Sequence, residues 1–386
     1  MGNTLTPIIR NLTTAFQRVA AERASLAAVA QMDFKAEEAA LNQVITIPIA
    51  PVVVGAARTP AATFTVAADR TVTNTSITIT KDQKYPFHLT GDDYTRMSQN
   101  PDFMPTSVDQ ALRAWRNEVH SDLAGLHQTA AGYFSASTPS SGAALGTAGT
   151  TPFASDISLI TGAEKLLNDS LAPLEGRYLF IDTAAKNNLG NLNQLVKANE
   201  AGTTDLLRQG IIGQIAGFNV IWGNDVKLWT PVGTGASYVA NGVNAAGSTS
   251  LVVKTGTGTI LAGDAINVSS GGVSTRYVVL TGIAAAGTLV LTSGLIQATA
   301  DSDVVTVIAA SRRNMAFHRE ALGLAIRLPK LPPRGDMGEH QVITDPMTGI
   351  QVRFSRYVGY GLENWEISSA WGVKTVRPEL SKIILG

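Results

Sequence analysis

The chain has 386 residues, and its 30 Lys and Arg side chains balance 30 Asp and Glu, so the formal net charge is zero. This balance argues against a dedicated nucleic-acid-binding protein, which usually carries a basic excess. Charged residues make up only 16% of the chain, well below a typical globular protein, so we expect other protein to cover much of the surface. The absence of cysteine excludes disulfides, thiolate zinc sites and cysteine nucleophiles.

Apolar residues recur at helical spacing from Leu5 to Val29, which predicts an amphipathic helix that begins near Pro7. Charges at Arg10 and Arg18 interrupt this region, so it does not read as a signal peptide. No apolar stretch approaches the ~18 residues of a membrane-spanning helix. We therefore expect a protein that is made inside a cell and stays there or leaves by another route.

Residues 44–89 follow a β pattern. Pro48 and Pro51 confine the first part to an edge or loop-like strand, because proline cannot donate to a ladder. Alternating polar and apolar residues then predict a long two-stranded ribbon with its turn at Ala67–Arg70. A lone hairpin is marginally stable in water, so we expect this ribbon to lie on an outside surface.

The strongest helix pattern spans Ser107–Gly132, with Thr106 or Ser107 as its cap. Its apolar stripe consists of Val108, Leu112, Trp115, Val119, Leu123 and Leu126. Residues 135–152 are rich in Ser, Gly, Thr, Ala and Pro and predict a linker.

Beyond the linker, the patterns predict a mixed α and β body. Helices are expected at 154–169 and 183–195, a buried strand at 177–182, and strands with glycine turns at 211–226. Residues 231–310 contain five charges and short strands separated by glycine turns, the pattern of a small β-barrel or sandwich. The chain then returns to mixed α and β patterns and ends in strands over 351–385. We therefore predict an α+β body that is interrupted by an inserted all-β domain.

The sequence contains no hydrolase elbow, phosphate-binding loop, dinucleotide fingerprint or HExxH zinc motif. The five histidines are His88, His120, His127, His318 and His340. His120 and His127 share one face of the long helix, and we interpret them as surface histidines in preference to zinc ligands, because no third ligand is implied.

Two tight carboxylate groups, Asp92–Asp93 and Asp301–Asp303, are more simply acidic turns than metal or general-acid sites. Core packing explains the tryptophans near strands better than ligand stacking does: Trp222, Trp229, Trp365 and Trp371. We therefore predict no catalytic, cofactor-binding or metal-binding residues and no enzyme activity.

The order of elements resembles the Hong-Kong-97 phage capsid fold of tailed-bacteriophage major capsid proteins. The resemblance rests on NTLTPII, QGIIGQIAGFNVIWGNDV, AGDAINV, AFHREALGLAI and SSAWGVKTVRPELSKIIL. Within that fold, the chain is most similar to the P-twenty-two-like coat subfamily, which carries an inserted β-domain.

The resemblance implies an N-terminal arm at 1–45, an E-loop ribbon at 46–90 and a peripheral domain at 91–152 built on the spine helix 107–132. An axial domain would occupy 153–230, the barrel-like insertion 231–310, and the remaining axial and peripheral strands 311–386. It further implies hexamers and pentamers that assemble in the host cytoplasm into an icosahedral virion shell around packaged double-stranded DNA. The implied partners are scaffolding protein, portal and a decoration protein, with weak non-specific contact to DNA and no membrane.

Some relatives crosslink their subunits through an E-loop lysine. Lys81 and Lys84 are the lysines near this ribbon, no catalytic Glu can be matched, and we predict no such chemistry. A different class of function stays open at this point: a β-rich tail or adhesin protein that binds a receptor or glycan through 231–310. That alternative leaves the N-terminal helix, the ribbon and the spine helix without a purpose.

Overall fold

The computed structural model describes residues 26–49, 73–93, 103–128, 145–192, 195, 213–332, 335–344 and 350–386. Most of the helix expected over 5–29 lies outside these residues, although its last turn, α2 (Leu26–Val29), is helical. The turn expected at Ala67–Arg70 also lies outside them. The chain forms two compact units, the first mainly from 32–111 and 324–374, and the second mainly from 112–323 and 375–386.

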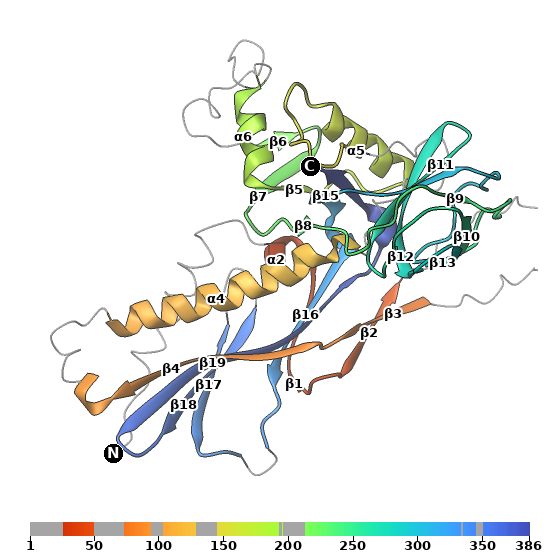
Figure 1. Cartoon of the computed structure of the whole chain (residues 1–386). Helices are drawn as coiled ribbons and strands as arrows, with labels where there is room; N and C mark the ends of the chain where they lie inside the picture. Colours follow the sequence, from red (N-terminus) through yellow and green to blue (C-terminus); the bar gives the residue numbers. More distant parts are fainter. Residues whose placement is uncertain are drawn as a thin grey trace, which may run out of the picture. The chain divides into compact units, whose positions relative to one another are not determined.

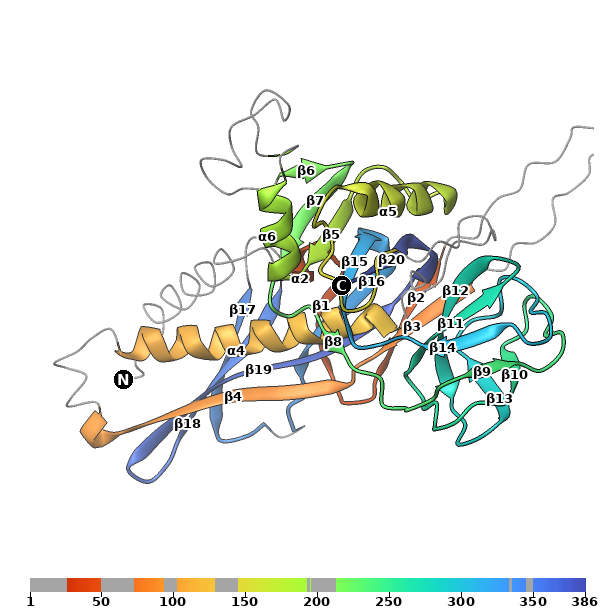
Figure 2. The same ribbon diagram turned by 45° about the horizontal axis from the view of Figure 1, so that its top comes forward.

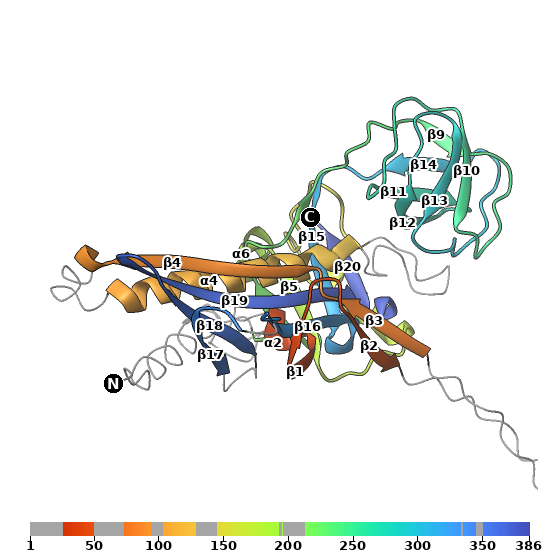
Figure 3. The same cartoon turned by 90° about the horizontal axis from the view of Figure 1, so that it is seen from below.

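The first unit is built on a six-stranded sheet that the chain reaches from both ends (Figure 1). Its path is β1 (Gln31–Ala39), β16 (Leu322–Pro329), β19 (Leu362–Thr375), β18 (Gln351–Val358) and β17 (Gly338–Thr344). Strand β4 (Lys81–Thr90) pairs with β19 from Lys81↔Trp371 to Thr90↔Leu362, and Figure 3 shows the two strands side by side along this length. The strands predicted over 351–385 are confirmed.

A separate two-stranded ribbon joins β2 (Val44–Ile49) to β3 (Thr73–Thr78). The sequence pattern placed the partner of β3 next to the Ala67–Arg70 turn, whereas its partner in the structure is β2. The physical reason is burial, because Ile45 and Ile47 pack against the same small core as Ile77. Pro48 is tolerated because the described part of this sheet has only two strands, so β2 has an open edge, as predicted.

Helix α4 (Phe103–Gly125) continues as a 3₁₀ turn over Leu126–Gln128. It begins before the predicted cap at Thr106 or Ser107, because Pro105 fits the first turn of a helix, where its missing N–H has no partner to lose. Its predicted stripe is otherwise confirmed, and five members are buried: Val108, Leu112, Trp115, Val119 and Leu123. Among the described residues no helix is both long enough and apolar enough to cross a membrane.

The second unit contains a mixed sheet in the order β20 (Ser381–Leu385), β15 (Ser311–His318), β5 (Arg177–Ile181), β7 (Phe218–Trp222) and β6 (Gln214–Ile215). Helices α5 (Ser158–Asp169) and α6 (Thr183–Asn191) accompany this sheet (Figure 2). Asp182 caps α6 by accepting hydrogen bonds from the backbone N–H groups of Ala184 and Ala185. The predicted helices and strands of this region are confirmed, although α5 begins later than expected and without a side-chain cap, and α6 ends earlier.

The linker predicted over 135–152 is wrong in its second half. The Leu145 carbonyl accepts a hydrogen bond of 3.1 Å from the Leu385 backbone N–H, and Gly146 forms a bridge to Leu385. A Cβ on Gly146 would lie 2.2 Å from the Leu385 oxygen, so only glycine fits here. The composition resembled a linker because small residues also serve where two backbones meet closely.

The predicted inserted β-domain is a closed six-stranded barrel (Figure 2). Its strands follow the order β10 (Ser250–Lys254), β13 (Gly287–Leu291), β12 (Val273–Thr281), β11 (Ala265–Ser270), β14 (Val304–Val307) and β9 (Tyr238–Ala240). Just outside the barrel, β8 (Leu228–Trp229) pairs with the start of β15 through Trp229↔Ser311. The chain therefore leaves the mixed sheet and returns to it at neighbouring positions.

The buried Asp264 carboxylate organises one end of the barrel. It accepts hydrogen bonds from the backbone N–H groups of Val232, Gly233 and Leu261, at 2.8, 3.0 and 2.8 Å. On another strand, the Arg276 guanidinium donates to the carbonyls of Leu145 and Gly146, at 3.3 and 3.1 Å. The first contact joins the segment before β9 to the turn before β11, and the second joins the barrel to the segment beside β20.

Candidate functional site

The two histidines of α4 and its 3₁₀ turn are buried, so the interpretation of them as surface residues is wrong. His120 Nε2 accepts a hydrogen bond of 3.0 Å from the Leu26 backbone N–H, and its Nδ1 lies 3.7 Å from Asp225. His127 meets the ring of Trp229 edge-on. Burial, reinforced by nearby cationic side chains, lowers the pKa of His127 to about 3. A neutral imidazole that packs edge-on against Trp229 fits a structural role.

The described residues contain no group of three His, Cys, Asp or Glu side chains placed to hold a metal ion. The carboxylates that the sequence analysis singled out instead accept hydrogen bonds that stabilise turns. Asp93 accepts hydrogen bonds from the backbone and side chain of Thr90, at 2.9 and 2.7 Å. Asp301 accepts from the Gly242 N–H, and Asp303 from the Ala300 N–H. The interpretation as acidic turns is confirmed for these three residues.

The four tryptophans that the sequence singled out differ in exposure, and Trp229 is partly buried. Trp371 and Trp365 are buried, as predicted for core residues. Trp222 is exposed, with the Lys186 ammonium 5.3 Å from its ring centroid, so the core interpretation is wrong for this residue. Trp222 is the last residue of β7, and the exposed position begins where the buried residues Val220 and Ile221 end.

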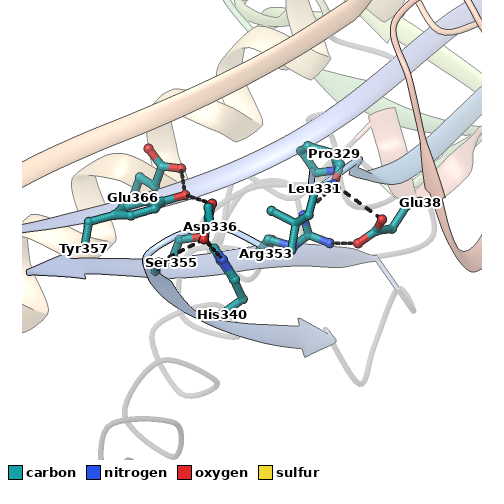
Figure 4. Close-up of polar contacts among 10 residues, drawn as sticks. Glu38, Pro329, Leu331, Asp336, His340, Arg353, Ser355, Tyr357 and Glu366 are labelled. Atoms are coloured by element: carbon teal, nitrogen blue, oxygen red, sulfur yellow. Dashed lines mark hydrogen bonds and ion pairs between the residues drawn. The ribbon is translucent and has the colours of Figure 1, made fainter. Parts of the chain in front are cut away.

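The described chain brings an aspartate, a histidine and a serine together at the edge of the first unit's sheet (Figure 4). Asp336 Oδ1 lies 2.5 Å from His340 Nε2, and His340 Nδ1 lies 2.9 Å from Ser355 Oγ. These contacts follow the order of a hydrolase triad. Ser355 is only 1% exposed, however, so no substrate can reach its hydroxyl. The arrangement therefore holds the segment before β17 against β18 and does not support nucleophilic catalysis.

Tyr357 extends this polar network (Figure 4). Its hydroxyl donates to Asp336 at 3.0 Å and lies 3.4 Å from a Glu366 oxygen. Burial and the two carboxylates raise the pKa of Tyr357 to about 12. Burial alone would raise the pKa of Asp336, but hydrogen bonds from Gly338, His340 and Tyr357 hold it below its usual value. Asp336 therefore stays ionised and anchors the start of β17.

A second polar contact stabilises the other end of the segment between β16 and β17 (Figure 4). Arg353 of β18 forms an ion pair of 2.5 Å with Glu38 of β1 and donates to the carbonyl of Pro329 at the end of β16. The backbone N–H of Leu331 also donates to Glu38. Arg353 is nearly buried and joins three strands that come from distant parts of the sequence.

A patch of exposed apolar side chains lies close to this network. It consists of Met337, Val358, Tyr360 and Leu362, and we call it the sheet-end patch. Met337 precedes the pair Gly338↔Tyr357, and the other three belong to the hairpin between β18 and β19, so all four lie at one end of the sheet. Met337 is 98% exposed, and Tyr360 is fully exposed. Exposed apolar side chains at the end of a sheet are available for contact with other protein.

Sequence reasoning missed both the sheet-end patch and the polar network. The stretch VGYGL, with apolar residues between glycines in a hairpin turn, was a usable signal for an exposed apolar tip. The network had no comparable signal. Arg353 and Glu38 are separated by 315 positions and come together only through the order of the strands.

No protein-family model and no curated protein matches the chain. Among solved structures, the chain is similar to the capsid of the cyanophage P-SCSP1u, at 13% identity over 94% of this chain and 88% of that one, with a TM-score of 0.46. It is similar to the mature capsid of bacteriophage PhiM1, at 13% identity over 94% and 86%, with a TM-score of 0.44. It is also similar to a virus-like particle from Pyrococcus furiosus, at 8% identity over 98% and 99%, with a TM-score of 0.41. Phage capsids, the class that the sequence resemblance named, are thus among the structures to which this chain is similar.

Proposed function

We propose that this chain is the major capsid protein of a tailed bacteriophage. Copies assemble as hexamers and pentamers into the icosahedral shell that encloses packaged double-stranded DNA. The observation that carries the proposal is the order of elements in one chain. A two-stranded ribbon, a long helix, a mixed sheet with two helices, an inserted barrel and closing strands follow one another as the resemblance requires.

The surface chemistry supports the same function. The described residues expose large apolar side chains in both units, among them the sheet-end patch and Leu171, Leu174, Leu228 and Val243. The ribbon adds strand edges whose N–H and C=O groups have no partner strand among the described residues. A shell subunit hides such groups against its neighbours. Several interfaces of roughly 1,600 Å² each then give a stable particle from individually weak contacts.

The proposal includes a division of the chain into capsid domains. Residues 1–45 form the N-terminal arm, 46–90 the E-loop, 91–152 the peripheral domain, 153–230 the axial domain, 231–310 the insertion of the P-twenty-two-like subfamily, and 311–386 the remaining axial and peripheral strands. Within the E-loop, the ribbon β2–β3 is the protruding part, and β4 belongs to the sheet beside it.

The proposed partners are other copies of the chain, a scaffolding protein, a portal and a decoration protein. Contact with packaged DNA is weak, because a neutral wall does not hold phosphates by counterion release. The mature protein is located in the virion after assembly in the host cytoplasm. No catalytic step and no lysine crosslink are part of the proposal. Lys81, the ribbon-side candidate, lies over the ring of Trp371 with its Nζ 5.8 Å from the centroid.

Electron microscopy of the purified full chain tests this function. We expect closed shells or rings of five and six subunits. The comparison variant replaces residues 50–72 with a two-residue Asn-Gly turn, which keeps the β2–β3 pairs and leaves β4 in its sheet. Since the ribbon supplies contacts between subunits, this variant should remain a folded single subunit and form no shells.

Two outcomes would overturn the assignment. One is a full chain that forms only single subunits or fibres, the result expected of a tail or adhesin protein. The other is a shortened variant that assembles normal particles, which would remove the ribbon from the contacts between subunits. Circular dichroism of both proteins separates a failure to assemble from a failure to fold.

A further inference from the structure

The sequence contains a single Asn-Gly pair, Asn241–Gly242, directly after β9 of the barrel. Asparagine followed by glycine closes readily to a succinimide, because glycine has no side chain to hinder the backbone nitrogen that attacks. Asn241 is exposed, and no described residue is seen to hydrogen-bond its side chain. Gly242 has a φ of +71°, with open space where a Cβ would stand. The pair is therefore sterically free to react.

Two charged side chains restrain the pair, and we call this group the Asp301 latch. The Gly242 backbone N–H donates to Asp301 Oδ1 at 2.7 Å. The Lys254 ammonium donates to both oxygens of the same carboxylate, at 2.6 and 2.7 Å. The hydrogen bond from Lys254, followed by that from Gly242, holds the pKa of Asp301 below its usual value. The carboxylate is thus ionised at neutral pH.

The latch opposes ring closure in two ways. The nitrogen of Gly242 must give up its proton before it attacks, and a carboxylate 2.7 Å away disfavours negative charge on that nitrogen. The nitrogen must also turn toward the side chain of Asn241, which breaks its hydrogen bond to Asp301. The backbone N–H of Asn241 is held as well, by the carbonyl of Val252 at 2.9 Å.

We propose that Asn241–Gly242 is a site of spontaneous covalent modification whose rate is set by the Asp301 latch. The Gly242 nitrogen loses its proton to a solvent base and forms a bond to Asn241 Cγ, and the side-chain nitrogen leaves as ammonia. Water then adds to one of the two ring carbonyls and opens the ring. The product at position 241 is aspartate or isoaspartate, with no change in oxidation state.

The product weakens the structure that slowed its formation. Either form adds a negative charge at the residue next to Gly242, whose N–H binds the Asp301 carboxylate, and nearby like charges repel. Isoaspartate also inserts an extra carbon into the backbone of the turn. The modification is therefore a one-way chemical mark on the exposed end of the barrel, and this inference holds whether or not the chain forms a shell.

The test compares the full-length chain with the variant Asp301→Ala during incubation at a fixed, mildly alkaline pH. Peptide mapping by mass spectrometry follows the gain of one mass unit at Asn241, and labelling with isoaspartyl methyltransferase identifies the rearranged product. We expect slow modification of the unaltered chain and a rate at least about tenfold higher in the variant, the effect of removing one charge-assisted hydrogen bond.

Asn244 is the internal control, because it is buried and both atoms of its side-chain amide are hydrogen-bonded. It should stay unmodified in every sample. Lys254→Met is the second variant, since it loosens Asp301 without removing the carboxylate, and it should react faster than the unaltered chain but more slowly than Asp301→Ala. If Asp301→Ala fails to fold, the comparison of modification rates between Lys254→Met and the unaltered chain tests the proposal. Equal rates in the unaltered chain and the folded variants overturn the latch, and an intact Asn241 in all of them overturns the site.

Discussion

Lys382 lies within a strand whose five residues are all buried, and it is 1% exposed. Its ammonium donates to Ser170 Oγ at 3.1 Å, at the end of α5. Burial lowers the pKa of Lys382 to about 8, against the opposing effects of Glu379 and Asp169. The folded chain therefore binds this proton less tightly than the unfolded chain, so the charged amine costs stability at neutral pH, and the cost falls as the pH rises from about 8 toward 10.5.

The variant Lys382→Met should raise the free energy of unfolding at pH 7 by about 1–3 kcal/mol, because methionine fills similar space without a charge. Urea unfolding of the unassembled chain measures this change. The gain should shrink as the pH is raised toward 10. Lys165→Met, which removes an exposed pair with Asp169, is the matched control and should change stability by less than about 0.5 kcal/mol. A destabilised Lys382→Met variant would show that the ammonium supports the fold.

Single residues were the hardest features to predict from the sequence. His120 and His127 were placed on the surface because the stripe of the long helix was identified from apolar residues alone. The structure buries His120 through a hydrogen bond from Leu26, which lies 94 positions away. No local sequence pattern indicates a hydrogen-bond partner that is so distant in the chain. The turn roles of Asp93, Asp301 and Asp303 were predictable, because each bonds groups close by or supports a glycine turn.

At the scale of elements, the base of the β2–β3 ribbon depends on a close approach between backbones. A Cβ on Gly372 of β19 would lie 2.0 Å from the carbonyl oxygen of Thr78. Around this contact, the Thr80 N–H donates to the carbonyl of Trp371, and Lys374 donates to the carbonyl of Ser76. Glycine is therefore required at 372 to seat the ribbon on the sheet.

Gly372→Ala should destabilise the chain by about 2–4 kcal/mol, because the obstacle is backbone and cannot rotate away. Hydrogen exchange should show the loss of protection concentrated in β2, β3 and the adjacent part of β19. Gly91→Ala is the control, since a Cβ there meets no heavy atom within 4 Å, and it should leave stability almost unchanged. Equal protection patterns for the two variants would contradict the role of Gly372.

Element types were predictable wherever local periodicity determined them. The stripe of α4, helix α6 and the short strands of the barrel all follow from patterns within a few residues. Pairing partners were not predictable in the same way. The partner of β3 was misassigned, and β1 was missed, because its place beside β16 depends on residues almost 300 positions away.

At the scale of the whole molecule, the barrel has the features of an independently folding part. Its sheet closes on itself, so it has no open edge, and the buried Asp264 carboxylate joins its first segment to the turn before β11. We predict that a fragment of residues 228–312 folds alone, with a cooperative thermal transition and a β-type circular dichroism spectrum.

Asp264→Ala in this fragment should lower stability by about 3 kcal/mol, because three backbone donors lose their acceptor. Asp303→Ala removes the acceptor of a single exposed N–H and should cost less than about 1 kcal/mol. A fragment that stays unfolded in buffer, or two variants with the same effect, would contradict the independence of the barrel.

The pairing of β8 with β15 has a consequence for protein engineering and for evolution. Trp229 and Ser311 are partners on neighbouring strands, so the two stems of the barrel stand about 5 Å apart. Because the chain enters and leaves the barrel at neighbouring positions, the barrel can be exchanged for another domain without distorting the sheet. Any small domain whose termini lie close together could be inserted between Trp229 and Ser311, and a short hairpin could replace the barrel altogether.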